Sequence, residues 1–121
     1  MNTKREYAFE KLRVWQAARG LAKAVYLATT TFPRTEIYGL TSQCNRAAVS
    51  IAANLAEGSS RRSKKDQAHF SEIAYSSLTE LACLLILCRD VDLLSPDAEG
   101  SLRSSIEQLS AQLKRIAPKP T

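Results

Sequence analysis

The sequence predicts an all-α protein, an antiparallel up-down-up-down four-helix bundle. Apolar residues recur at three- and four-residue spacing through four long segments. Short stretches rich in proline, glycine and serine separate those segments, and no alternating pattern is left over for a strand. Short connections favour antiparallel neighbours. We expect one domain over residues 1–121, with helices at about 11–31, 36–57, 64–91 and 96–117.

The first helix should follow a polar, loosely docked start at residues 1–10. It should end before Pro33, because the residue before a proline disfavours helix. Gly20 lies inside it and is a candidate for a close helix contact. Its expected buried face is Leu12, Trp15, Ala18, Ala22, Val25, Ala28 and Phe32, widened by Val14, Leu21 and Leu27.

The second helix carries two stripes, and the chain is organised around it. Gly58 is expected to end this helix as a residue with positive φ. The apolar stripe is rich in alanine, so a neighbouring helix can approach closely. Its members are Leu40, Cys44, Ala47, Ala48, Ile51, Ala52 and Leu55. The polar stripe consists of Gln43, Arg46, Ser50, Asn54 and Glu57.

The third and fourth helices have clear start signals. Ser63 is expected to cap one, with Asp66 three residues later, and Ser95 precedes Pro96 at the start of the other. Residues 81–87 are apolar almost all round, which predicts either a central position or a subunit contact. The fourth helix shows only a narrow apolar stripe: Leu102, Ile106, Leu109, Leu113 and Ile116.

Antiparallel pairing of the second and third helices extends the polar stripe to Ser77 and Glu80. It should place Asn54 near Phe70, Ser50 near residues 73–74, and Arg46 near residues 77–80. We expect Arg46 and Glu80 to form a partly buried ion pair, since arginine suits a bidentate carboxylate contact. A catalytic cleft is disfavoured, because no nucleophile–base pair and no histidine accompany the stripe.

The same topology sorts charge between the two ends of the bundle. The chain has 17 Lys and Arg against 12 Asp and Glu, a net charge of +5. One end should gather 11 of these basic residues: Lys4, Arg5, Lys11, Arg13, Arg61, Arg62, Lys64, Lys65, Lys114, Arg115 and Lys119. Such a cluster favours an anionic partner such as RNA or DNA, against the alternative of a merely solvated turn.

Other features point away from several classes of protein. The start of the chain lacks an apolar signal core and no segment reads as a membrane span, so we expect a cytoplasmic protein. Cys44, Cys83 and Cys88 are expected to be reduced thiols in the core. With one histidine and no nucleotide or hydrolase motif, we expect no metal site, no cofactor and no catalytic residue. Asp90 and Asp92 are more simply read as solvated than as ion ligands.

Three segments together resemble a known family: residues 9–16 (FEKLRVWQ), residues 32–43 from Phe-Pro to Gln, and residues 46–58 (RAAVSIAANLAEG). The chain is similar to four-helix-bundle proteins related to the 23S rRNA intervening-sequence protein and to the accessory variability determinant of diversity-generating retroelements. The likeness covers residues 9 to about 94. Ser76 departs from the glycine common in the family.

The resemblance implies an up-down bundle and a homo-oligomer, with a pentamer as the assembly. The retroelement relatives bind nucleic acid and a reverse transcriptase, so the resemblance keeps nucleic acid open as a partner here. We expect a non-enzymatic oligomeric module that binds RNA or DNA through its basic end. A scaffold for a partner protein is the alternative. A ribonuclease using Arg62 and His69 is a remote one, because that spacing is common by chance.

Overall fold

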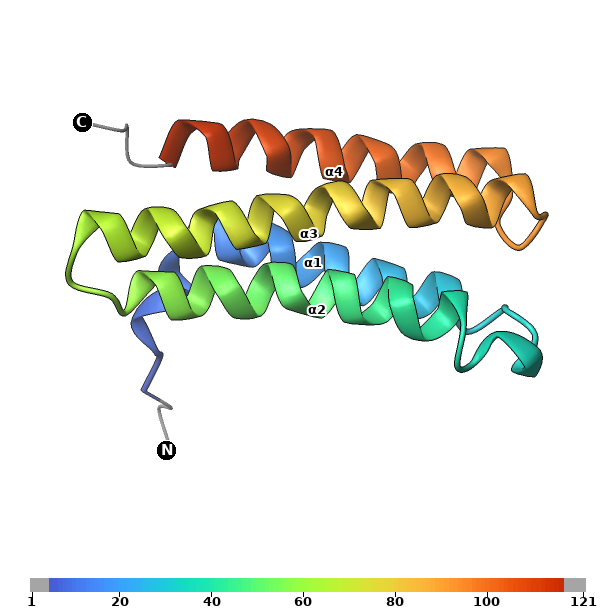
Figure 1. Ribbon diagram of the computed structural model, residues 1–121, viewed down its shortest axis with the longest axis horizontal. Coiled ribbons are helices and arrows are strands. Elements are labelled where there is room, and N and C mark those ends of the chain that lie inside the picture. The colour runs from blue at the N-terminus through green and yellow to red at the C-terminus, as the bar shows by residue number, and fades with distance from the viewer. Residues whose placement is uncertain (1–4, 117–121) are drawn as a thin grey trace.

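The computed structural model describes residues 5–116 and contains four long helices. They are α1 (Arg13–Thr29), α2 (Leu40–Ser59), α3 (Lys64–Asp90) and α4 (Pro96–Ile116). Two 3-10 turns, η1 (Ala8–Lys11) and η2 (Arg34–Glu36), precede α1 and α2. The four helices run alternately up and down along one axis (Figure 1).

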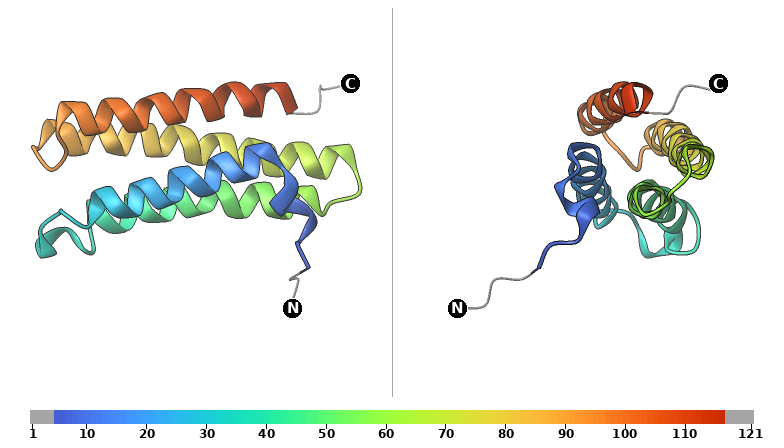
Figure 2. Two further views of the ribbon diagram at one scale, coloured as in Figure 1. Left: turned by 180° about the vertical axis from the view of Figure 1, so that it is seen from behind. Right: turned by 90° about the vertical axis from the view of Figure 1, so that its left-hand side faces the viewer.

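Seen along that axis, the helices stand at the corners of a square (Figure 2). Each packs against its neighbours in sequence, and α1 closes the ring against α4. The predicted up-down-up-down bundle is therefore confirmed. One end of the bundle carries the chain start, the α2–α3 turn and the end of α4, and the other end carries the α1–α2 and α3–α4 connections.

The helix boundaries differ from the predicted ones by a few residues. Residues 1–10 were predicted to be loosely docked, but the described part of them leads into η1, where Glu10 accepts a hydrogen bond from the Tyr7 amide (2.9 Å). Residues 1–4 lie outside the described residues. The second helix begins at Leu40 rather than residue 36, since η2 and a turn occupy residues 34–39. It also continues to Ser59, two residues beyond its predicted end.

The core lies between all four helices, and its largest fully buried side chains include Ile51, Leu81 and Leu85. On α1, the buried stripe is turned relative to the predicted one. Val14, Ala18, Leu21 and Val25 are buried, whereas Trp15 is only partly buried and Leu27 is 62% exposed. The many apolar residues of α1 allowed two overlapping stripes, and packing against both α2 and α4 selects between them.

Gly58 lies where α2 and α3 pack closely together. The prediction that it ends the helix with positive φ is wrong, because no described glycine has positive φ and α2 continues past it. A Cβ at this position would lie 2.8 Å from Cβ of Phe70 on α3. Gly58 is therefore required by the packing of two helices. By contrast, a Cβ on Gly20 would meet nothing within 4 Å.

A small polar cluster joins the middle of α2 to α3. The hydroxyls of Ser50 and Ser77 lie 2.8 Å apart, and the Asn54 amide donates to the Ser50 carbonyl (2.8 Å) and to its hydroxyl oxygen (3.1 Å). Ser50 thus faces Ser77 rather than residues 73–74. The residues of α2 that face a given residue of α3 are therefore shifted by about one helical turn from the prediction, because α2 continues past residue 57.

The predicted buried pair between Arg46 and Glu80 is wrong. Both side chains are exposed, and within residues 5–116 no ion pair joins them. The shifted pairing of α2 and α3 explains this result. Gln43 and Glu57 are exposed as well, so only the Ser50, Asn54 and Ser77 part of the polar stripe links the two helices.

A buried carboxylate anchors the connection between α3 and α4. Glu99 is 3% exposed and accepts hydrogen bonds from Arg89 (3.0 Å) and Arg103 (2.8 Å). The Arg103 hydrogen bond is the main cause that holds the pKa of Glu99 below its usual range, and Arg89 adds to it. Asp92, with φ of 63°, ends α3, and the Leu93 amide reaches the Cys88 carbonyl (2.8 Å) as in a Schellman motif.

Helix α3 carries a long apolar stretch in its second half. It is long and apolar enough to cross a membrane by length and composition alone, although core helices pass the same test. In the bundle it buries Leu78, Leu81 and Leu85 among its neighbours. Its outer face keeps Ile86 and Leu87 40% and 46% exposed. The bundle therefore does not bury every side of this helix.

The glycine contact gives a first prediction. Gly58→Ala should lower the free energy of unfolding by about 1–3 kcal/mol, because the added methyl meets Phe70 close to the backbone. Gly20→Ala is the matched control and should stabilise the protein by about 1 kcal/mol, as alanine favours helix and the site is open. Urea unfolding measures both. Equal effects of the two variants would contradict the role given to Gly58.

Glu99 gives a prediction on pH dependence. Its folded-state pKa is depressed, so its contribution to stability is present above the ordinary pKa of glutamate, about 4.3, and is lost as pH falls through the folded value. Glu99→Gln should lower the melting temperature at pH 7, and the gap to the unmodified protein should close below about pH 4. A gap that stays constant from pH 7 to pH 3 would refute this account.

Candidate nucleic-acid interface

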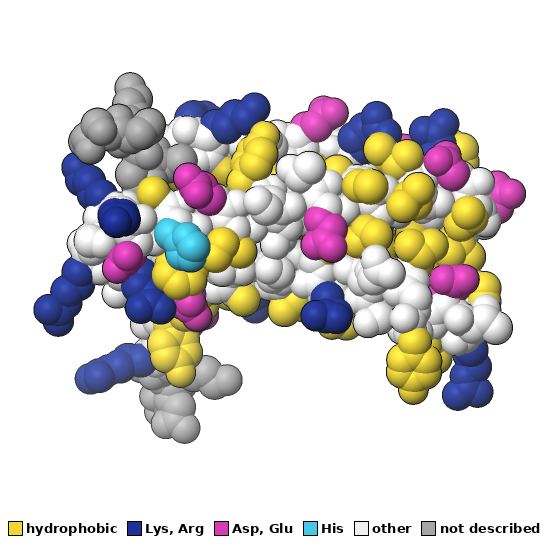
Figure 3. All heavy atoms as spheres, in the orientation of Figure 1, with side chains coloured by type: hydrophobic (Ala, Val, Ile, Leu, Met, Phe, Trp, Pro, Cys, Tyr) yellow, Lys and Arg dark blue, Asp and Glu magenta, His cyan; other side chains and the backbone are white. Residues whose placement is uncertain are grey.

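The basic end predicted from the sequence forms in the structure. We define the basic pole as residues 5–16, 57–66 and 114–116, which lie at the end of the bundle that holds the α2–α3 turn. These segments contain nine Lys and Arg against four Asp and Glu. Lys and Arg side chains project from this end in the space-filling view (Figure 3). Lys4 and Lys119 lie outside the described residues.

The opposite end has the reverse balance. Residues 30–39 and 89–99 carry five acids, one of them (Asp92) on the turn after α3, against Arg34 and Arg89. Because α1 and α3 point one way and α2 and α4 the other, their helix dipoles largely cancel. The uneven field of the molecule therefore comes from its side chains.

Arg61 is held in place within the α2–α3 turn. Its guanidinium lies 3.4 Å from the Glu57 carboxylate and 4.8 Å from the centre of the Phe70 ring. Gln67 donates to its carbonyl oxygen (2.9 Å). These contacts make Arg61 part of the turn's own structure, and they shape the turn that presents the residues after it.

Arg62, Lys64 and Lys65 project from the same turn and are all exposed. Across the part of the chain that the structure describes, none of them has a carboxylate within 4.0 Å. Ser63 caps α3 by accepting a hydrogen bond from the Asp66 amide (3.1 Å), as predicted. The cap places Lys64 and Lys65 in the first turn of α3, where the helix dipole disfavours cations.

The other predicted basic residues surround this turn. Lys11 and Arg13 are exposed at the start of α1, and Lys114 and Arg115 are exposed at the end of α4. The Lys114 ammonium lies 6.0 Å from the centre of the Tyr75 ring. A hydrogen bond with Ser110 and, next, the charge of Lys114 lower the pKa of Tyr75. The structure thus brings together at one end all eight residues predicted to contact nucleic acid.

Sequence reasoning missed a group of aromatic side chains at this pole. The rings of Tyr7 and Phe9 stack with centres 5.5 Å apart and planes 4° apart. Phe9 in turn meets Trp15 edge-on at 4.8 Å, and the Arg19 guanidinium lies 5.5 Å from the centre of the Trp15 ring. Residues 58–65 contain no aromatic residue. The fold nevertheless brings Tyr7, Phe9 and Trp15 to the end of the bundle that holds this turn.

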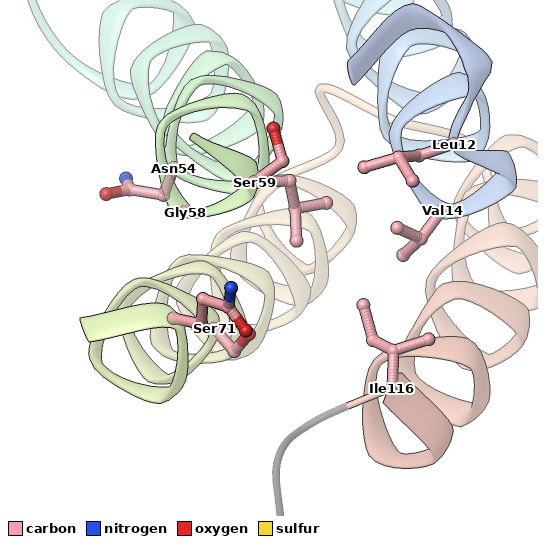
Figure 4. A pocket seen from close by; sticks show the side chains of 9 residues that line it. Leu12, Val14, Asn54, Gly58, Ser59, Ser71 and Ile116 are labelled. Carbon is pink, nitrogen blue, oxygen red and sulfur yellow. The ribbon is translucent and has the colours of Figure 1, made fainter. Parts of the chain in front are cut away.

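The bundle is also hollow at this end. A cavity of about 120 Å³ opens between the four helices. Figure 4 shows Leu12 just before α1, Val14 on α1 and Ile116 on α4 pointing into it, while Asn54 points away. Ser71 and Gln67 line the side formed by α3. The cavity is mostly apolar and lies at the end of the bundle that carries the basic pole.

The remaining chemically interesting residues do not form a site. Cys44 and Cys88 are buried with their sulfurs 3.7 Å apart, and burial raises the pKa of Cys44 to about 12. Cys83 is exposed, contrary to the prediction that all three thiols are in the core. His69 is exposed, and its ring meets Phe70 edge-on at 5.4 Å. Within residues 5–116, no three metal-ligand side chains cluster.

The family model for the 23S rRNA-intervening sequence protein matches residues 10–115. The chain belongs to this family. The match begins within η1 and takes in the basic α2–α3 turn and nearly all of α4, so it extends past residue 94, where the resemblance noted from motifs ended.

A solved structure supports the fold of this 23S rRNA-intervening sequence family member. It is a protein of unknown function from the S23 ribosomal protein family of Bacteroides thetaiotaomicron, with a TM-score of 0.78. Sequence identity is 18%, and the match covers 88% of this chain and 99% of that one. At this identity the likeness concerns the fold alone. No curated protein matches the chain.

Proposed function

We propose that this family member is a non-enzymatic, homo-oligomeric module that binds RNA or DNA through its basic pole. The observation that carries the proposal is the cluster of exposed cations around the α2–α3 turn, with Arg62, Lys64 and Lys65 lacking ion pairs among the described residues. Phosphate groups are the natural partners for such a cluster.

The position of two of these cations adds to the argument. Lys64 and Lys65 stand in the first turn of α3, where a positive charge costs about 0.3–1 kcal/mol. Acidic or neutral residues there would stabilise the helix. Folding therefore does not account for this choice of residues, whereas contact with a polyanion does.

Assembly is proposed from the outer face of α3. Cys83, Ile86 and Leu87 form an exposed apolar strip on this face, which we call the α3 strip. Hydrophobic side chains gather over the half of the molecule near the acidic end in Figure 3. Exposed apolar patches often mark interaction sites. A second copy is the occupant we propose, and the family resemblance names a ring of five as the assembly.

Two alternatives are weaker. A scaffold for another protein could use the α3 strip, but it leaves the basic pole unexplained. A ribonuclease would need Arg62 and His69 to act together at a phosphodiester. Both are exposed, and the structure records no hydrogen bond between them or from either to an activating carboxylate within residues 5–116.

Binding through the pole predicts a specific salt dependence. The triple variant Arg62→Gln, Lys64→Gln and Lys65→Gln should bind an oligonucleotide more weakly than the unmodified protein. Its plot of log K against log salt should be shallower by roughly 0.7 for each lost contact with a single strand. Fluorescence anisotropy between 50 and 200 mM salt, roughly the range over which phosphate contacts are most visible, measures this slope.

A control variant separates the pole from net charge. Lys23→Gln with Arg34→Gln removes two exposed cations away from the pole and should leave the slope unchanged. The triple variant should also be no less stable than the parent, since it relieves the start of α3 of positive charge. Equal loss of binding in both variants, or binding insensitive to salt, would contradict the assignment of the pole.

The assembly proposal makes a separate prediction. Leu87→Lys should reduce the particle to the mass of one 13.4 kDa chain in light scattering, because it places a charge in the α3 strip without entering the core. Leu27→Lys, an exposed site on α1, is the control and should leave the assembly intact. A parent protein that is monomeric at high micromolar concentration would refute self-assembly.

A further inference from the structure

We propose that the exposed ring of Tyr7 is a stacking platform for an unpaired base, so that the nucleic acid bound at the pole is single-stranded where it crosses η1. The inference rests on the proposed function and names the form of the ligand. Tyr7, Phe9 and Trp15 are not among the residues that the sequence predicts to bind nucleic acid.

The aromatic stack is supported on one side and open on the other. The inner face of Tyr7 lies on Phe9, with ring planes 4° apart, and Phe9 is braced by Trp15. The Tyr7 side chain is nevertheless 69% exposed, so the face turned away from Phe9 is available. An incoming base would continue this stack as its next ring.

The platform is held in position by backbone contacts. The Glu10 carboxylate accepts the Tyr7 amide (2.9 Å), and Gln16 donates from its side chain to the Glu10 carbonyl (2.7 Å). These bonds fix η1 against the start of α1. A ring fixed before binding loses little freedom when a base stacks on it, which favours affinity.

A groove runs beside the platform. It has a volume of about 490 Å³ and lies between residues 7–9 and the last turns of α2, where Ala53 and Ala56 form an apolar wall. Glu57 also lines it, and its carboxylate is paired with Arg61 at 3.4 Å. The groove is therefore apolar in its walls and leads to the cationic turn.

The cations and the exposed aromatic ring of the basic pole together favour single-stranded nucleic acid as the ligand. Proteins that bind single strands combine a positively charged track for the backbone with aromatic rings on which bases stack. At this pole the cations of the α2–α3 turn supply the track, and Tyr7 supplies the ring. In a duplex the bases are stacked on one another and closed to such a ring.

The test compares two strands of equal charge. An oligothymidylate and an abasic strand of the same length are titrated at one salt concentration against the full chain. The unmodified protein should bind oligothymidylate more tightly than the abasic strand. Tyr7→Ala should weaken the affinity for oligothymidylate by about five- to 150-fold and leave the affinity for the abasic strand unchanged. Tyr7→Phe should retain the preference, as it keeps the ring.

A matched control lies at the other end of the bundle. Tyr38 is 97% exposed at the end of the bundle opposite the basic pole, and Tyr38→Ala should change neither titration. Neither substitution enters the core, so both variants should fold. Equal binding of the two strands by the unmodified protein, or equal loss of both in Tyr7→Ala, would overturn the stacking role and leave the basic pole standing. Binding of neither strand at low salt would overturn the proposed function and this inference together.

Discussion

The close approach of α2 to α3 is the contact on which the rest of the structure depends. It is set at three levels: Gly58 against Phe70, the Ser50 and Ser77 hydroxyls in the middle, and the sulfurs of Cys44 and Cys88 at the far end. Small side chains on α2 make the approach possible, because each removes bulk from the interface. The contact fixes the pairing of the two helices and, through Phe70, the position of Arg61 in their turn.

The pairing of α2 with α3 also determines how charge is distributed between the two ends of the molecule. Once α2 and α3 form an antiparallel hairpin, the chain start and the end of α4 lie beside their turn, and the cations of three distant segments meet. The family membership and the solved relative establish the architecture, and neither assigns an activity to it. The case for nucleic acid therefore comes from the chemistry of the pole: cations that folding does not require, beside the exposed ring of Tyr7.

Much of this could be predicted from the sequence, and the failures have physical causes. Helical spacing and the caps at Ser63 and Ser95 gave the fold, because they are local signals. The position of Gly58 was found but its role was not, since a helix end and a close contact both favour glycine. The Arg46–Glu80 ion pair was predicted wrongly, because the residues that face each other across α2 and α3 depend on where α2 ends. The aromatic platform was missed, as it joins the start of the chain to a turn about fifty residues away.

One measurement tests the central claim most directly: size-exclusion chromatography with light scattering, run with and without a mixed RNA and DNA oligonucleotide at low and high salt. The account predicts a particle larger than the 13.4 kDa chain, five times that mass for the ring, which takes up oligonucleotide at low salt and releases it at high salt. An assembly that takes up none at low salt would contradict the role of the basic pole and leave a protein scaffold as the better description.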